Sequence, residues 1–144
     1  MIDELYSREI LKRTTQLMHV GRLEAPDGTA ERTSKLCGSH IVVDVKMDGD
    51  VVSDFAHDVE ACALGQASAA ILSQHVIGAT VAEITAARDA LKAMLKGDEV
   101  TFPERFADLA ILKSVKDFPA RHTSTQLAFE ATVSAINEVK NKAA

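Results

Sequence analysis

Residues 36–63 decide the fold, and they are LCGSHIVVDVKMDGDVVSDFAHDVEACA. In residues 40–47 every second side chain is apolar, which is the period-two pattern of a strand with one buried face. Asp48-Gly49 has the residues of a tight hairpin turn, and residues 51–59 return with a second alternating pattern. The stretch therefore predicts a β-hairpin made of two strands of similar length.

Both cysteines of the protein, Cys37 and Cys62, lie at the two open ends of this predicted hairpin. Because the strands have similar lengths, we expect the two thiols to approach each other and to form a candidate metal or sulfur site. Residues 61–76 predict a helix with Cys62 near its amino end, and its many small side chains, Gly65 among them, would let it lie close against the sheet. Unpaired N–H groups and the helix dipole at the amino end lower the pKa of a thiol.

The rest of the chain is predicted to be mainly helical, from apolar residues at helical spacing and turn formers between them. Helices are predicted for residues 3–20, 61–76, 80–96 and a last stretch from Pro119 to about Lys140, with a further apolar segment from Phe102. Residues 22–35 are rich in turn formers, so we expect a mobile loop there. This order predicts an α+β fold, a small antiparallel β-sheet packed against several helices. The whole chain, 1–144, is predicted to be a single domain.

Charge and composition limit the function classes. The formal net charge is -5, which argues against a nucleic-acid surface because phosphate binding needs clustered Lys and Arg. The acidic start of the chain has no apolar signal-peptide region, and no apolar run approaches the roughly 20 residues that span a bilayer. We therefore expect a cytoplasmic protein with reduced cysteines. Since no phosphate loop, Ser-His-Asp order or paired-carboxylate motif is present, we predict that the protein is not an enzyme.

Three short motifs carry a family resemblance. They are Leu-Cys-Gly at 36–38 before a strand, Glu-Ala-Cys at 60–62 opening a helix, and Phe-Pro-Ala-Arg at 118–121 before the last helix. With them, nearly the whole chain resembles the U-type iron-sulfur cluster assembly scaffolds, the family of the NifU N-terminal domain, IscU and SufU. Residues 97–117 resemble the insertion of the SufU type, so that type is the closer relative. The resemblance implies a SufE/NifU-like fold.

The resemblance also implies a ligand set of three cysteines and one aspartate. Cys37 and Cys62 match the first two cysteines of the family and are the predicted cofactor-binding residues for an iron-sulfur cluster or zinc. Ser39 stands in the place of the aspartate, and Ser124 stands where the third cysteine is expected. Two of the four ligands are therefore replaced by serine, whose neutral hydroxyl is a poor ligand for a soft or borderline metal.

Two histidines are candidates to complete the site. His40 is next to the replaced aspartate, and His122 is two residues before the replaced cysteine. Neutral imidazole is a good ligand for zinc or iron, although a solvent-exposed histidine is the simpler interpretation of each. The predicted metal ligands are Cys37, Cys62, His40, His122 and Ser124.

The resemblance implies a function in iron-sulfur cluster assembly. A scaffold-like protein would bind iron, zinc or a transient [2Fe-2S] cluster through Cys37 and Cys62, with a cysteine desulfurase and other iron-sulfur assembly proteins as partners. One alternative is a sulfur-relay protein that carries a persulfide on a cysteine without any metal. Another is a ligand-depleted homologue that acts as a binding or regulatory module. Arg121 matches an arginine near the family's site and is a candidate to steady a thiolate, with a surface ion pair as the alternative.

Overall fold

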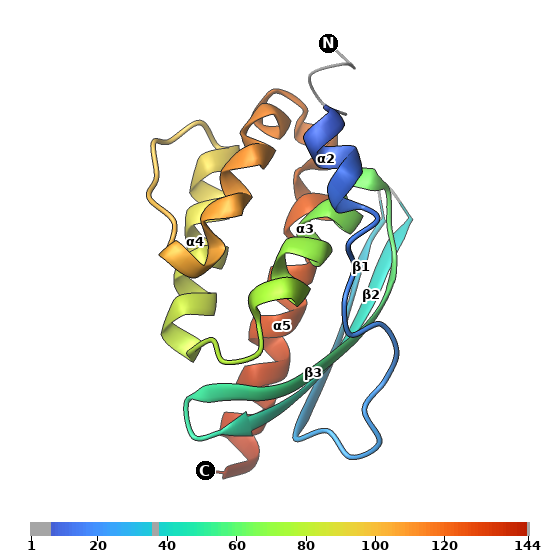
Figure 1. Ribbon diagram of the computed structural model, residues 1–144, viewed down its shortest axis with the longest axis vertical. Coiled ribbons are helices and arrows are strands. Elements are labelled where there is room, and N and C mark those ends of the chain that lie inside the picture. The colour runs from blue at the N-terminus through green and yellow to red at the C-terminus, as the bar shows by residue number, and fades with distance from the viewer. Residues whose placement is uncertain (1–6, 36–37, 144) are drawn as a thin grey trace.

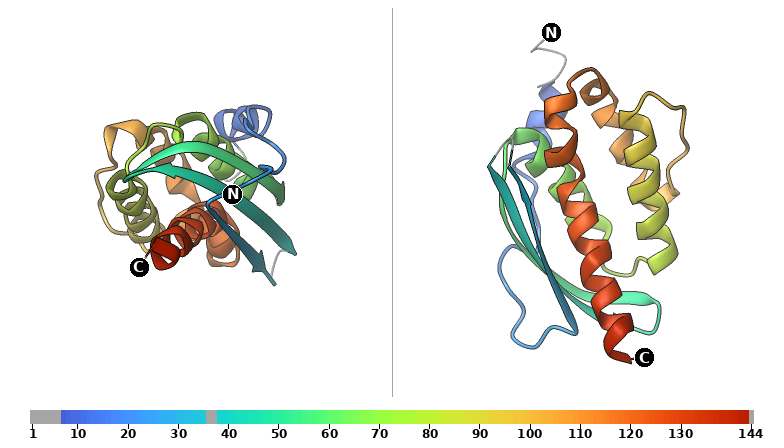
Figure 2. Two further views of the ribbon diagram at one scale, coloured as in Figure 1. Left: turned by 90° about the horizontal axis from the view of Figure 1, so that it is seen from below. Right: turned by 180° about the vertical axis from the view of Figure 1, so that it is seen from behind.

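The computed structural model describes residues 7–35 and 38–143, and it confirms the predicted α+β class (Figure 1). The elements in chain order are α2 (Arg8–Arg13), β1 (Gly28–Ser34), β2 (Ser39–Asp48), β3 (Val51–Glu60), α3 (Ala63–His75), α4 (Val81–Leu95), η1 (Glu104–Asp117), η2 (Pro119–Arg121) and α5 (His122–Ala143). The sheet forms one layer, α5 runs along its inner face, and α4 lies on the other side of α5 (Figures 1 and 2). Helix α3 packs against α5 in the same middle layer.

The predicted hairpin is confirmed as strands β2 and β3. They pair antiparallel, with Val43 opposite His57 and Val45 opposite Phe55, and the register shifts once between Lys46 and Met47. The inward-facing valines are fully buried beneath the helices, as the alternating pattern predicts. β3 ends where β2 begins, with Glu60 opposite His40, and this places the start of α3 beside the start of β2.

The predicted loop over residues 22–35 is wrong, because its second half is a third strand. β1 pairs antiparallel with β2, from Gly28 opposite Val45 to Ser34 opposite Ser39, so the strand order is β1-β2-β3. The strand sequence, GTAERTS, has no apolar alternation that would predict it. Its position depends on packing against α5 instead. Gly28 lies so close to α5 that a Cβ atom there would collide with the carbonyl oxygen of Ala135, so only glycine permits this contact.

The helix predicted over residues 3–20 is also wrong after Arg13, because the chain is not helical from there to residue 20. Residues 3–6 lie outside the described ranges, and helix α2 ends at Arg13. The chain then runs beside the free edge of β3, where the N–H of His57 donates to the carbonyl of His19 and the N–H of Gly21 donates to the carbonyl of His57. An unpaired strand edge offers hydrogen bonds that a helix continuing past Arg13 would forgo.

The segment that follows this edge covers the outer face of the sheet and is held by one buried carboxylate. Asp44 is fully buried, and it accepts hydrogen bonds from the Arg22 guanidinium at 2.6 and 3.1 Å, the Leu23 N–H at 3.0 Å and the Thr29 hydroxyl at 2.7 Å. Burial alone would raise the pKa of Asp44, but the bonds from Arg22, Thr29 and Leu23 together lower it. The carboxylate thus ties this segment and β1 to the central strand.

The apolar segment predicted from Phe102 forms the 3-10 helix η1. Its four buried residues, Phe106, Leu109, Leu112 and Val115, recur every third position. The backbone departs from helical angles at Phe106, and the three residues per turn of the 3-10 helix after it place Leu109, Leu112 and Val115 on one face. That face packs against α3 and α4. The predicted helices at 61–76, at 80–96 and after Pro119 are confirmed as α3, α4 and α5, and α4 begins with a capping box formed by Thr80 and Glu83.

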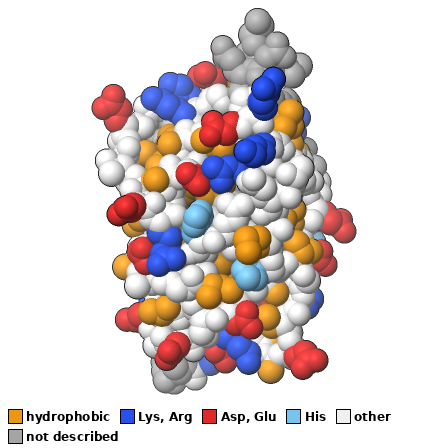
Figure 3. Space-filling view, viewed as in Figure 1, with side chains coloured by type: hydrophobic (Ala, Val, Ile, Leu, Met, Phe, Trp, Pro, Cys, Tyr) orange, Lys and Arg blue, Asp and Glu red, His pale blue; other side chains and the backbone are white. Residues whose placement is uncertain are grey.

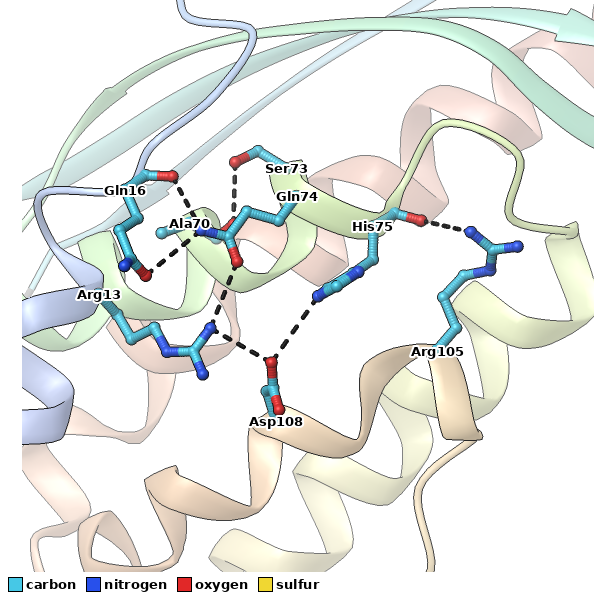
Figure 4. A network of polar contacts seen from close by, with 8 residues as sticks. All are labelled: Arg13, Gln16, Ala70, Ser73, Gln74, His75, Arg105 and Asp108. Carbon is cyan, nitrogen blue, oxygen red and sulfur yellow. Dashed lines mark hydrogen bonds and ion pairs between the residues drawn. The ribbon is translucent and has the colours of Figure 1, made fainter.

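A polar network holds the carboxyl end of α3 against its neighbours (Figure 4). Arg13 of α2 contacts the Asp108 carboxylate at 3.2 Å and donates to the Gln74 side-chain oxygen at 3.3 Å. His75 lies 3.7 Å from the same carboxylate, and Arg105 donates to the His75 carbonyl at 3.1 Å. Because these contacts join α2, α3 and η1, they help to fix the direction in which the amino end of α3 points.

The face that carries α2, α3, α4 and η1 has a mixed charge distribution. Figure 3 shows Lys and Arg side chains among Asp and Glu side chains there, with apolar atoms scattered between them. The described part of this face therefore offers no basic patch of the kind that phosphate binding requires. None of the helices in the described part of the chain combines the length and apolar character that a bilayer crossing requires.

Candidate functional site

Cys62 occupies the N-cap position of α3, between the end of β3 and the first turn of the helix. Its backbone is extended, with φ -65° and ψ 171°, and its free thiol is half-buried. The first N–H groups of a helix have no partner within the helix, and they carry partial positive charge. A sulfur atom at this position is therefore close to a favourable environment for negative charge.

Two serine hydroxyls extend from the thiol into the protein. The Ser124 Oγ atom of α5 lies 3.3 Å from the Cys62 sulfur and 3.0 Å from the Ser39 Oγ atom of β2. Both serines are 1% exposed, so solvent reaches the thiol but not the hydroxyls behind it. We call Cys62, Ser39 and Ser124 the thiol–serine cluster.

A glycine permits this close approach of α3 to α5. A Cβ atom at Gly65 would lie 3.0 Å from the Ser124 Oγ atom and 2.8 Å from the Cβ of Ala61. The small residues of α3 therefore bring the helix against α5, in addition to the sheet contact that the sequence predicts. Without this contact, the Ser124 hydroxyl would be held farther from the thiol.

The pKa of the Cys62 thiol is lowered from its ordinary value. Burial by itself would raise the pKa, but the Ser124 hydrogen bond, the N–H groups of Gly65 and Leu64 and the charge of Arg121 together outweigh it. The direction agrees with the prediction from the helix start, and Arg121 contributes as the sequence suggested. The cluster therefore favours a thiolate, which is the nucleophilic form of cysteine.

Ionisation of the thiol fixes the direction of the hydrogen bonds. A thiolate can only accept, so the Ser124 hydroxyl must donate to the sulfur, and each serine has one proton to donate. The Ser39 hydroxyl must then donate to the Ser124 oxygen. Negative charge on Cys62 is thus supported by two hydroxyls acting in series.

The structure brings Ser124 to Cys62, whereas Cys37 lies outside the described residues. His40 is placed on the sheet face opposite to Ser39, because successive strand residues point to opposite faces. Its Nε2 atom lies 2.7 Å from the Glu31 carboxylate on the neighbouring strand. His40 is therefore not brought to the thiol–serine cluster.

His122 also has other partners. Its Nε2 atom lies 3.0 Å from the Val115 carbonyl oxygen and 3.1 Å from that of Lys116, both at the end of η1. Only a protonated Nε2 can bond these oxygens, and a nitrogen that carries a proton cannot bind a metal through the same atom. The imidazole therefore faces η1, while Ser124, two positions further along α5, faces Cys62.

The described donors do not by themselves fit a resident metal. Within residues 7–35 and 38–143, no three side chains of His, Cys, Asp and Glu gather as a metal site would require. Zinc sites and iron-sulfur clusters are normally completed to four ligands by thiolate, imidazole or carboxylate groups. The thiol–serine cluster offers one thiol and two neutral hydroxyls instead.

Sequence reasoning missed three features of the site. It noted Ser39 and Ser124 separately as replaced ligands, but not that they contact each other. The signal was available, because residues at two ligand positions of one metal site must lie close together. It assigned Gly65 to sheet packing rather than to the α5 contact. It also placed Ser34 in a loop, although this residue lies opposite Ser39 in the sheet.

The family assignment follows from comparison with known proteins. The chain matches the family described as the NifU-like N terminal domain over residues 5–142 and belongs to that family, which confirms the resemblance found in the sequence. A solved structure of a nitrogen-fixing NifU-like protein (N-terminal) from Brucella abortus is 45% identical, covers 98% of each chain and has a TM-score of 0.95. The fold is therefore that of the family.

Two relatives carry functional names. The iron-sulfur cluster assembly scaffold protein IscU of Streptococcus pyogenes serotype M1 is 26% identical over 97% of this chain and 87% of its own length. The zinc-dependent sulfurtransferase SufU of Bacillus subtilis is 26% identical over 90% of this chain and 88% of its own length. Because one relative is named a sulfurtransferase, the expectation that this protein is not an enzyme stays a prediction.

Proposed function

We propose that this protein is a scaffold-type protein of iron-sulfur cluster assembly, which works in the cytoplasm with a cysteine desulfurase and other assembly proteins. Its cargo is sulfur, and then iron or a transient [2Fe-2S] unit, held by Cys62 together with Cys37. The observation that carries the proposal is the half-buried Cys62 thiol, whose pKa is lowered at the start of α3. Family membership and the names of the relatives support the assignment.

The sulfur step is a transfer between two cysteines. The Cys62 thiolate attacks the outer sulfur of a donor persulfide, a new S–S bond forms on Cys62, and the donor's S–S bond breaks. The donor cysteine leaves as a thiolate, and the transferred sulfur keeps its proton, so no net oxidation occurs. A lowered thiol pKa increases the fraction of Cys62 that can make this attack near neutral pH.

The small ligand set explains why the cargo would be transient. Cys37 and Cys62 provide two of the four ligands that a [2Fe-2S] unit normally receives, and the serines add only weak donors. An incompletely held cluster is passed easily to a protein that offers a full set. Zinc would be held weakly for the same reason.

Sulfur and iron loading test the proposal. The purified protein would be incubated anaerobically with a cysteine desulfurase, cysteine and ferrous iron, and added sulfur would be located by mass spectrometry after alkylation. We expect persulfide on Cys62, with bound iron and sulfide that fall together in a Cys62→Ser, Cys37→Ser double variant. Ser114→Ala, on η1, is the matched control. No sulfur on either cysteine and no retained iron would refute the assignment.

A further inference from the structure

A third buried serine lies next to the thiol–serine cluster. Ser34, the last residue of β1, is 1% exposed, and its Oγ atom is buried with no hydrogen-bond partner among the residues that the structure describes. It lies directly opposite Ser39 in the antiparallel register, so the two side chains are on the same face of the sheet. Their Cβ atoms are then about 5 Å apart, as in other directly opposed pairs.

An unpartnered buried hydroxyl has a cost that the fold does not explain. A polar group removed from water without a hydrogen bond destabilises the folded state, and alanine at position 34 would avoid that penalty. Ser34 has a donor proton that no described residue uses. This points to a ligand that accepts a hydrogen bond at the inner side of the site.

We propose that Ser34, Ser39 and Ser124 form a hydroxyl pocket that holds a persulfide on Cys62, so that sulfur is carried at this step without a metal. The inference rests on the proposed function, and it names the chemistry of the bound sulfur. It also accounts for the disagreement between the family's ligand positions and the serines found here. Hydroxyls are poor metal ligands, but they are good donors to an anionic sulfur.

The geometry supports such a pocket. The Ser124 hydroxyl lies 3.3 Å from the Cys62 sulfur, which becomes the inner sulfur of a persulfide, so it can donate a hydrogen bond to that atom. Ser39 lies 3.0 Å behind it and supports the charge in series. The donor approaches the thiol from solvent, while the hydroxyls contact it from the buried side.

Loading with inorganic polysulfide tests the pocket without a protein partner. In a Cys37→Ser background, the thiolate takes one sulfur from tetrasulfide and releases trisulfide, which balances without another reagent. The reaction would run with a zinc chelator present, and the yield and lifetime of the Cys62 persulfide would be followed by alkylation and mass spectrometry. We expect full loading of the parent, and lifetimes several-fold shorter in Ser124→Ala and Ser34→Ala.

Two controls separate a hydroxyl effect from a packing effect. Ser114→Ala removes another buried, unpartnered hydroxyl on η1, and its persulfide lifetime should equal that of the parent. Ser34→Thr keeps a hydroxyl on a residue type that suits a strand, so it should restore the lifetime lost in Ser34→Ala. Thermal unfolding of each variant would show that the fold is retained.

The outcomes distinguish this inference from the proposed function. Equal yields and lifetimes in Ser34→Ala, Ser124→Ala and the parent would overturn the pocket but leave sulfur transfer to Cys62 intact. Loss of loading when the chelator is present would also overturn it, because a metal would then be required. If neither polysulfide nor a desulfurase loads the wild-type protein, both the pocket and the proposed function fail.

Discussion

Gly65→Ala should separate the two helices that form the site. The added Cβ atom would lie 2.8 Å from the Ala61 Cβ and 3.0 Å from the Ser124 Oγ atom. Carbon atoms in contact prefer at least about 3.5 Å, so α3 must shift by roughly 0.7 Å relative to Ala61. The 3.2 Å contact with the Ser124 carbonyl oxygen adds to the strain, because backbone of α5 cannot rotate away.

Two opposing terms set the size of the effect. Overpacking of a buried contact costs about 1–3 kcal/mol, while alanine in place of glycine in the first turn of a helix gains at most about 1 kcal/mol. We therefore expect the free energy of unfolding to fall by about 1 kcal/mol. The same shift lengthens the bond from Ser124 to the thiol, so the rate at which iodoacetamide alkylates Cys62 at neutral pH should fall as well.

Chemical denaturation and alkylation kinetics measure both effects, in a Cys37→Ser background that leaves one thiol. Ala61→Gly removes the shortest of the new contacts, so the Ala61→Gly, Gly65→Ala double variant should recover stability relative to the sum of the two single variants. The reasoning would be refuted if Gly65→Ala stabilised the protein by its full helix propensity and left the alkylation rate unchanged.

Three further results are expected. Asp44→Asn should lower the free energy of unfolding at pH 7 by about 1–3 kcal/mol. Folding lowers the pKa of Asp44, so its contribution to the free energy of unfolding is present above its unfolded-state pKa of about 3.9. That contribution is lost as the pH falls through the folded-state pKa. Stability should therefore depend less on pH below pH 4 in the variant than in the wild-type protein, as urea titrations would show. Because both histidines have other partners, His40→Ala and His122→Ala should leave iron and zinc uptake unchanged in elemental analysis; a clear loss would support the sequence-based ligand prediction. The Ser39→Asp, Ser124→Cys double variant should bind near-equimolar zinc, and we expect the wild-type protein to retain much less. Failure of the variant to bind zinc would show that the site lacks metal geometry.

Local patterns were sufficient for most of the secondary structure. The alternation in residues 40–59 predicted β2 and β3, because side chains of a strand with one buried face repeat every two residues. The Thr80–Glu83 capping box and the apolar spacing after it predicted α4. The family motifs around Cys62 and residues 118–121 identified the family, and with it the fold.

The elements that were predicted wrongly depend on distant partners. β1 has a polar sequence, and it is a strand because β2 offers an edge and α5 covers Gly28. Residues 14–21 leave the helix because β3 offers unpaired backbone groups. No window of neighbouring residues contains these interactions, so local propensity could not predict them.

The sequence by itself determined the family, the hairpin, the helices that follow it and the placement of a cysteine at the start of α3. Only the tertiary structure decided that Ser124 and Ser39 support that thiol and that His40 and His122 face elsewhere. It also showed that Ser34 has no partner within residues 7–35 and 38–143. The reason is that helix and strand periodicities set which side of an element a residue occupies. The packing of α5 against both the sheet and α3 sets which of those sides meet.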